Sequence, residues 1–233
     1  MIANDRDGKM RALNRSNVVQ FLKIAAVYVL LVVGISLLPG KVTHEIVKEN
    51  GLIEVLSAAG YFLLCVFLIR FNYTGAIKTG FTPGFFLFFL GLRELDFHVR
   101  FTTMGIFKTK FFVSPQVPFT EKIIVTIFIL SLIAYGVIYL RRTLPGFKKA
   151  LLSGRPYAFS IVAAVGCICI SKLLDGNSKI FEILFPMLEN PRMLSVTMEE
   201  CLEMFIPVFF ILVLFQYRLD IAPGRAADNY VKV

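Results

Sequence analysis

Six long runs of hydrophobic residues constrain the fold of this chain more than any other feature of its sequence. A helix needs about 20 mostly apolar residues to cross the hydrocarbon core of a bilayer. The six runs have close to that length, and they cover residues 18–39, 51–69, 84–98, 122–140, 157–174 and 195–217. The sequence therefore predicts an all-α integral membrane protein, built as a bundle of six transmembrane helices.

The composition agrees with a protein that lies mostly in lipid. Hydrophobic residues make up 57% of the chain and the mean hydropathy is +0.72, both above the values of soluble domains. The net charge of +9 comes from Lys and Arg scattered through the connections, a distribution that argues against a nucleic-acid partner. Membrane lipids are the expected partners of most of the surface.

The distribution of basic residues predicts the orientation of the helices. Lys and Arg gather on the cytoplasmic side of membrane proteins. Taken together, the segment before the first run, the second and fourth connections and the segment after the sixth run carry 14 Lys and Arg, against 7 in the other three connections. We therefore expect a cytoplasmic segment over 1–17, a six-helix domain over 18–217 and a cytoplasmic tail over 218–233. The expected location is the inner (plasma) membrane of a bacterium.

The connections differ between the two sides. On the cytoplasmic side, residues 141–146 combine two arginines with a Pro-Gly pair, which is typical of a turn. On the outer side, residues 44–50, 101–113 and 178–188 mix aromatic and aliphatic side chains with isolated charges. Such sequences suit short helices that lie in the membrane interface. The sequence therefore predicts interfacial helical segments on the outer side.

Ionisable residues inside the runs gather at the outer ends of four helices. An ionised side chain near the centre of a transmembrane helix costs about 2.5 to 3.5 kcal/mol, so its position is informative. Because successive helices alternate in direction, these side chains lie at one depth and can converge. In chain order they are Glu54, Arg93, Glu94, Asp96, His98, Lys172, Asp175, Glu199, Glu200 and Glu203.

Three interpretations of this cluster remain open. It can bind a divalent cation, because mixed nitrogen and oxygen ligands suit zinc, manganese or calcium. It can be an ion-pair network in which Arg93 and Lys172 pair with the carboxylates and hold the helices together. It can also be a set of acids that face water at the helix ends. The ligands expected under the first interpretation are Glu54, Glu94, Asp96 and His98, together with one of Glu200 or Glu203.

Two functions follow from these interpretations. The first is a hydrolase or transferase, assisted by a metal ion, that acts on a lipid-type substrate from the outer leaflet. Glu54 and Glu200 are then the candidate bases, His98 a proton shuttle and Arg93 the group that stabilises negative charge. The second is a non-enzymatic membrane protein: a cation- or proton-linked transporter, a sensor or a complex subunit. Six helices are few for a transporter, so a homo-oligomer is expected.

A short stretch resembles a family of membrane enzymes. Residues 49–57, with the sequence Glu-Asn-Gly-Leu-Ile-Glu-Val-Leu-Ser, and the later His98 are similar to parts of the seven-helix membrane hydrolases that include the alkaline ceramidases. The resemblance covers short parts of two helices and implies a zinc-dependent hydrolase. That family is expected to bind zinc through several histidines, whereas this chain has two histidines in total.

Overall fold

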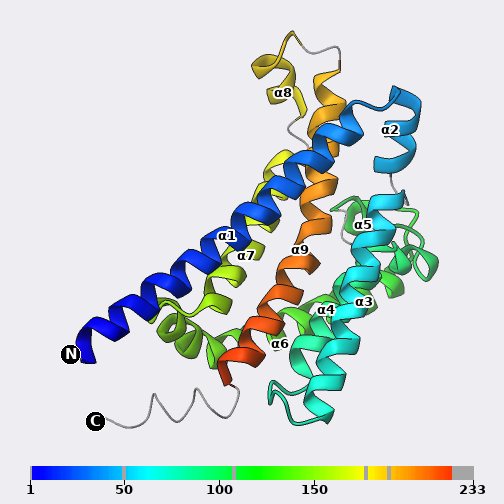
Figure 1. The fold of residues 1–233 in the computed structure, drawn as a ribbon. Coiled ribbons are helices and arrows are strands. Elements are labelled where there is room, and N and C mark those ends of the chain that lie inside the picture. Colours follow the sequence, from blue (N-terminus) through cyan, green and yellow to red (C-terminus); the bar gives the residue numbers. More distant parts are fainter. Residues whose placement is uncertain (1, 49–50, 107–108, 176–177, 188–189, 222–233) are drawn as a thin grey trace.

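The protein is helical throughout the part of the chain that the computed structural model describes. This part comprises residues 2–48, 51–106, 109–175, 178–187 and 190–221, without the side chains of 2–18, 98, 100 and 178–180. It contains no strand (Figure 1). The elements are α1 (Ile2–Ser36), α2 (Gly40–Val47), α3 (Leu52–Tyr73), α4 (Thr82–Glu94), η1 (Phe97–Arg100), α5 (Thr109–Val113), α6 (Phe119–Leu152), α7 (Pro156–Leu174), α8 (Ser178–Leu184) and α9 (Pro191–Ile221).

Four helical stretches within the described residues are long and apolar enough to cross a membrane. They lie in Val19–Ser36 of α1, in Gly40–Tyr73, in α6 and in α7. Helix α4 has 13 residues, so at about 1.5 Å per residue it measures about 20 Å, which is less than the bilayer core of about 30 Å. Helix α9 is longer but carries three glutamates near its start. The four apolar helices are therefore compatible with a membrane protein, while the count of six spans stays a prediction.

Helix α9 lies at the centre of the bundle and packs against α1, α3, α7 and α8 (Figure 1). The Tyr28 hydroxyl donates to the Met198 carbonyl at 3.2 Å, and Phe21 stacks on Phe209, so α1 runs antiparallel to α9. The helices at the six predicted runs alternate in direction along the chain. The start of α1 and the end of α9 consequently lie at the same end of the molecule.

Helix α7 packs closely on α9 through a face of small residues. Ser160, Ala164 and Ser171 are spaced so that they share one side of the helix, and each is fully buried. Small side chains let two helix backbones approach closely. The Ser160 hydroxyl donates to Gln216 at 2.7 Å, and Gln216 donates to Gln20 at 3.2 Å. These bonds join α7, α9 and α1 at the end that holds the start of α1.

Two glycines allow α3 to lie close to both α4 and α9. A Cβ atom added at Gly91 of α4 would lie 3.1 Å from the ring of Phe62, and one added at Gly60 would lie 3.0 Å from Pro207 of α9. Both distances are shorter than ordinary van der Waals contacts, so a side chain at either position would push the helices apart. The crossing of Gly60 and Pro207 places the upper part of α3 beside the polar part of α9.

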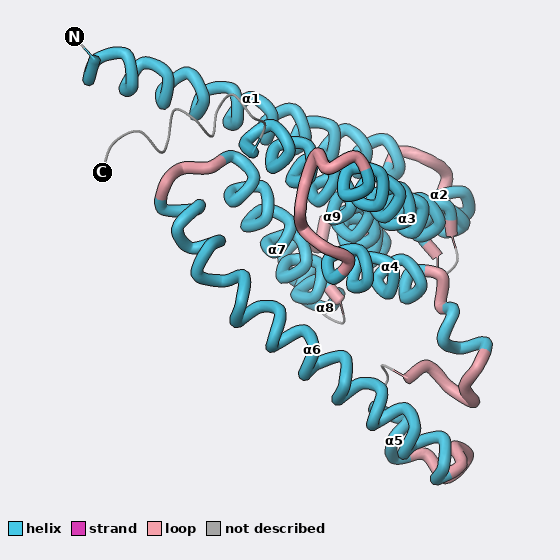
Figure 2. The backbone as a smooth tube through the Cα atoms, turned by 90° about the horizontal axis from the view of Figure 1, so that it is seen from below, coloured by secondary structure: helices cyan, strands magenta, loops and turns pink. Residues whose placement is uncertain are grey.

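Helix α6 forms a long arm beside the bundle. It has 34 residues and runs along one side of the molecule, with α5 near its start (Figure 2). Aromatic rings attach it to α4: Phe128 lies against Phe89, and Tyr135 stacks on Phe86. Most of its apolar side chains are exposed, among them Leu130. The arm therefore presents a large apolar surface that the described helices do not cover.

The predicted turn at residues 141–146 is wrong. Helix α6 continues through Pro145 to Leu152. A single proline removes one backbone hydrogen bond and kinks a helix without always ending it. The residues after Pro145, which include Lys148 and Ala150, have good helix propensity. Local composition therefore outweighs the turn signal of the Pro-Gly pair.

The three apolar connections contain short helices, as predicted. Helix α2 overlaps the first, α5 lies in the second and α8 in the third, while η1 directly precedes the second. The apolar connection around residues 101–113 has a small core of its own, in which the fully buried Phe111 packs with Ile106, Val117 and Val125. This core attaches the connection to the start of α6. The location of these segments in the membrane interface stays a prediction.

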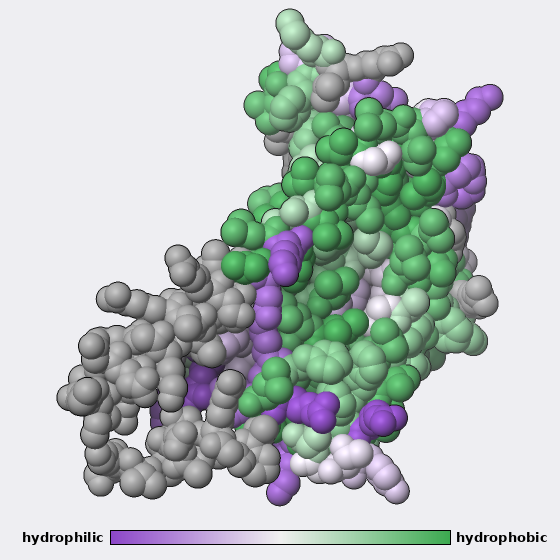
Figure 3. All heavy atoms as spheres, viewed as in Figure 1, coloured by the Kyte–Doolittle hydropathy of each residue, from purple (hydrophilic) through white to green (hydrophobic). Residues whose placement is uncertain are grey.

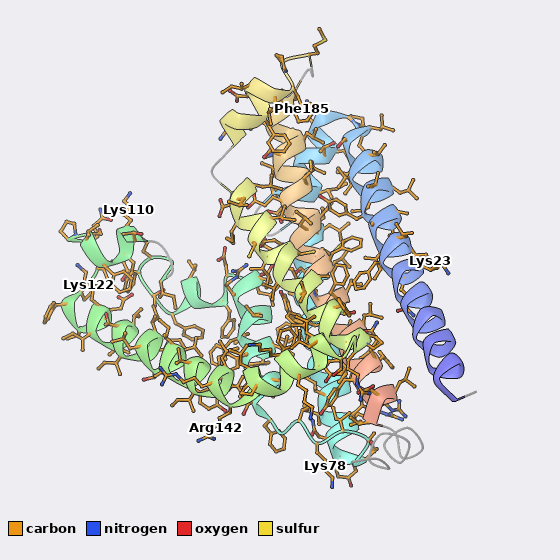
Figure 4. The ribbon with its side chains drawn as sticks, turned by 90° about the vertical axis from the view of Figure 1, so that its left-hand side faces the viewer. Lys23, Lys78, Lys110, Lys122, Arg142 and Phe185 are labelled. Atoms are coloured by element: carbon orange, nitrogen blue, oxygen red, sulfur yellow. The ribbon has the colours of Figure 1, made fainter. Side chains whose placement is uncertain are left out.

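The surface combines an apolar body with basic residues at several separate places. Apolar residues cover much of the face seen in Figure 3. Lys78 and Arg142 lie at one end of the molecule, while Phe185, just after α8, lies at the other (Figure 4). Lys110 and Lys122 lie apart from that end, near α5 and the start of α6 (Figure 4), so the assignment of a cytoplasmic end stays a prediction.

Candidate functional site

Arg93 is the centre of an ion-pair network at the end of α4. Its Nη2 atom lies 2.9 Å from Glu94 Oε1 and 3.4 Å from Glu203 Oε2 of α9. Helix α4 ends directly after this pair because Asp96 adopts a left-handed backbone with φ 46°, a conformation that Asp tolerates better than most residues. The helix end thus places the guanidinium group between two carboxylates from different helices.

The other oxygen of Glu203 is held by α7. The Ser171 hydroxyl donates to Glu203 Oε1 at 2.6 Å, and the Lys172 ammonium lies 3.2 Å from the same oxygen. Lys172 also lies 3.2 Å from Asp175. Glu203 therefore connects α4 with α7 through charge-assisted contacts, which are stronger than hydrogen bonds between neutral groups.

The backbone of α9 takes part as well. Pro207 has no N–H, so the carbonyl group of Glu203, four residues earlier, lacks its usual helical donor. The Ser57 hydroxyl of α3 donates to this carbonyl at 3.4 Å. Ser57 is 1% exposed, so the bond is shielded from solvent. This contact gives Ser57 a structural role and adds α3 to the elements joined at Glu203.

The acids of the network lie deeper than the cations. The side chain of Glu94 is 5% exposed and that of Glu203 16%, whereas Arg93 is 37% exposed and Lys172 49%. The aliphatic stems of Arg and Lys can lie along apolar surface while their charged ends remain accessible. The network is thus closed toward α3 and α9 and more open toward the side where Arg93 and Lys172 lie.

A cavity of about 50 Å³ adjoins the network. Four different helices contribute to its wall. A water molecule needs about 10 to 15 Å³ of such volume, so the cavity accommodates only a few non-hydrogen atoms. It is too small for a complete lipid head group with its scissile bond. The lining residues are Tyr61, Leu90, Arg93, Ile168, Ser171, Lys172, Glu203 and Ile206.

The two predicted bases lie near the network. Glu200 interacts electrostatically with Glu54, Glu94 and Glu203. The structure therefore brings Glu54 of α3, Glu94 of α4 and Glu200 and Glu203 of α9 into one region, as the sequence predicts. Their charges repel one another, while the direct ion pairs of Arg93 are with Glu94 and Glu203.

The predicted metal ligands are only partly brought together. Glu94 and Glu203 share Arg93 as a partner, but Asp96 lies in the turn after α4 and has no contact with either acid in the described part of the chain. The side chain of His98 lies outside the described residues. Among the residues that are described, no three His, Cys, Asp or Glu side chains are grouped so that they could hold a metal ion. The metal site stays a prediction.

Sequence reasoning missed Ser171 as a member of the site. Its signal was the small-residue face of α7, on which Ser171 follows Ala164 by seven residues. That face predicts contact with another helix, but it does not say that the partner is Glu203.

No protein-family model, no curated protein and no solved structure matches this chain.

Proposed function

We propose that this chain is a six-span membrane protein whose polar cluster is an ion-pair network that holds the helices together, and that it serves as a non-enzymatic subunit of a membrane complex. One observation carries the proposal: Glu203 of α9 is bonded by Arg93 of α4 on one oxygen and by Ser171 and Lys172 of α7 on the other. A carboxylate with both oxygens engaged is poorly suited to abstract a proton or to bind a metal ion.

The energetics of buried charges support a structural role. Removal of one partner from a buried ion pair costs about 3 to 5 kcal/mol, because an uncompensated charge remains. Glu94, with 5% of its side chain exposed, depends strongly on Arg93. The network therefore favours the one arrangement of α4, α7 and α9 in which the charges of Glu94 and Glu203 are compensated.

The long arm of α6 supports the role of a complex subunit. Its exposed apolar side chains include Ile124, Ile127 and Leu130, and its described contacts are mainly those with α4 and α7. Interactions between transmembrane helices depend on packing and on interhelical hydrogen bonds, and α6 has free surface for both. We propose that a second copy of this chain packs on α6.

A charge exchange between α4 and α9 tests the network. Arg93→Glu or Glu203→Arg alone places like charges together, and since Arg93 is 37% exposed we expect each to lower the stability by about 2 kcal/mol. The double variant restores an ion pair of opposite direction between positions 93 and 203 and should melt at a higher temperature in detergent than the sum of the single effects implies, but below the wild type, because Glu94 and Lys172 lose their partners. The matched control exchanges the exposed Glu182 and Arg192 and should change little.

Two results contradict the network. If each single variant melts like the wild type, the ion pairs do not hold the helices together. If the double variant melts no higher than the sum of the single effects implies, Arg93 and Glu203 are not energetically coupled.

The lipid-directed enzyme is the second candidate. The open rim at Arg93 and Lys172 favours it, because it gives a lipid access from the side, although the cavity holds only a few atoms of a substrate and the scissile bond would have to lie at the rim. An enzyme of this kind should release product from a lipid ester, and Glu200→Gln should abolish that release without changing the melting temperature. If Glu200→Gln lowers the melting temperature and the wild type shows no measurable turnover, the structural role is favoured.

A further inference from the structure

The hydroxyl group of Tyr61 is a buried polar group that the network leaves without a partner. Tyr61 is 3% exposed, lines the cavity and interacts electrostatically with Glu94, Arg93 and Glu203. Its hydroxyl makes no hydrogen bond to another residue in the described part of the chain. A buried hydroxyl that lacks a partner has lost the hydrogen bonds to water that it makes in the unfolded chain. The cavity is therefore a place where a ligand atom would gain a hydrogen bond.

The cavity offers more hydrogen-bond donors than acceptors. Arg93 uses only Nη2 in its two ion pairs, so N–H groups on Nε and Nη1 remain. Lys172 directs two of its three N–H bonds to Asp175 and Glu203. Both oxygens of Glu203 already accept. A ligand that satisfies these groups must itself be an acceptor.

The charges around the cavity select an uncharged acceptor. Arg93 and Lys172 are compensated by Glu94 and Glu203. Glu200 adds a further carboxylate that interacts with these acids, and an anion in the cavity would be repelled. A cation is equally disfavoured next to the free N–H groups of Arg93. An uncharged oxygen atom can accept hydrogen bonds from the free N–H groups and is not repelled by the carboxylates.

The shape of the cavity indicates where the ligand enters. Tyr61 and Ile206, 3% and 5% exposed, form the closed side. Ile168 is 37% exposed and lies with Arg93 and Lys172 on the open side. Apolar groups of α4, α7 and α9 thus surround a small polar centre, and about 50 Å³ holds a few atoms.

We propose that this cavity binds an uncharged hydrogen-bond-accepting oxygen group, which enters between α4 and α7 and bonds to Tyr61, Arg93 and Lys172. Two sources share this chemistry: the ester carbonyl of a membrane lipid and a small cluster of water molecules. The inference rests on the proposed ion-pair network, because the ion pairs hold Arg93 and Lys172 at the rim.

The lipid source is tested with the full chain in nanodiscs of diester phosphatidylcholine or of the diether analogue with the same chains, which lacks the carbonyl groups. If a lipid ester occupies the cavity, the wild type melts at a higher temperature in the diester lipid. Tyr61→Phe removes one hydrogen bond without changing a charge, and the difference between the two lipids should shrink in this variant.

The water source is tested by radiolytic hydroxyl-radical labelling, which modifies side chains in contact with bound water. Tyr61 should then be labelled at least as fast as Tyr28, which is more exposed and donates to Met198. The proposal is overturned if the two lipids give the same melting temperature and Tyr61 is labelled more slowly than Tyr28. The charge exchange of Arg93 and Glu203 tests the network alone, so failure of the ligand site and failure of the network are distinguishable.

Discussion

At the scale of single residues, the backbone of Glu203 is as important as its side chain. Pro207 leaves the Glu203 carbonyl without a helical donor, and Ser57 of α3 provides one from outside. Proline in a membrane helix is tolerated where a neighbouring side chain satisfies the freed carbonyl. Ser57 therefore compensates for a defect that the sequence of α9 creates.

A double-mutant cycle at this carbonyl should show coupling. Ser57→Ala should lower the free energy of unfolding by about 1 kcal/mol, because it leaves the Glu203 carbonyl without a donor. In a Pro207→Ala background the restored N–H takes that role, so the same change should cost less. Thermal unfolding in detergent measures both effects. As a control, Ser131→Ala removes a hydroxyl that bonds only to Ile127 of its own helix, and its effect should be independent of residue 207. Equal costs for Ser57→Ala in both backgrounds would contradict the compensation.

A chelator distinguishes the network from the predicted metal site. Because Arg93 and Lys172 compensate Glu94 and Glu203, we expect that an excess of EDTA leaves the melting temperature of the purified protein unchanged. Elemental analysis of the same sample should find no stoichiometric divalent cation. A melting temperature that falls with EDTA in the wild type, but not in Asp96→Asn or His98→Ala, would establish the metal site instead.

At the scale of helices, the pattern of small and polar residues explains which faces meet. The small face of α7 lies on α9, and the face of α3 with Glu54, Ser57 and Tyr61 turns toward the glutamates of α9. Helix α6 has no comparable face. Its alternatives are lipid and another protein. Among the described residues it contacts the core around Phe111 at its start, α4 through aromatic rings and the Thr82–Tyr135 hydrogen bond, and α7 through a short junction.

Cross-linking tests the proposal that α6 packs on a second copy. Leu130 is 60% exposed on α6 and Val66 is 58% exposed on α3, which makes them a matched pair. In a Cys169→Ser background, Leu130→Cys should give a covalent dimer with a short bismaleimide in membranes, and Val66→Cys should give much less. Equal yields from both positions would mean that contacts are random and that α6 is not an interface.

At the scale of the whole molecule, the two ends of the bundle differ in chemistry. The Arg93 network lies toward one end of α7 and α9. The other end is held by the ion pair of Arg155 with Asp220 and by the bond from Ser160 to Gln216. Lys78 and Arg142 lie at this second end (Figure 4). From the positive-inside rule we expect the second end to lie in the cytoplasm.

Reporter fusions test this orientation. With six spans, a fluorescent protein that folds only in the cytoplasm should be bright when it follows Val233, and alkaline phosphatase at the same position should be inactive. A fusion at Lys110, in the second apolar connection, should give the opposite pair of results. Active phosphatase after Val233 would reverse the orientation or show an odd number of spans.

The sequence by itself determined that the chain is helical and suited to a membrane, because apolar runs of about 20 residues leave few other structures. It also indicated that Glu54, Arg93, Glu94, Glu200 and Glu203 converge, since ionisable residues at alternate ends of successive helices lie at the same depth in the membrane. It could not show that α4 ends at Glu94 or that α6 continues past Pro145, because both depend on local competition between backbone conformations. Only the tertiary structure decided which charges pair. Glu203 is reached by Arg93, Ser171 and Lys172 because α4, α7 and α9 pack in one register. That register depends on small residues and on Pro207, which form contacts between segments distant in the sequence.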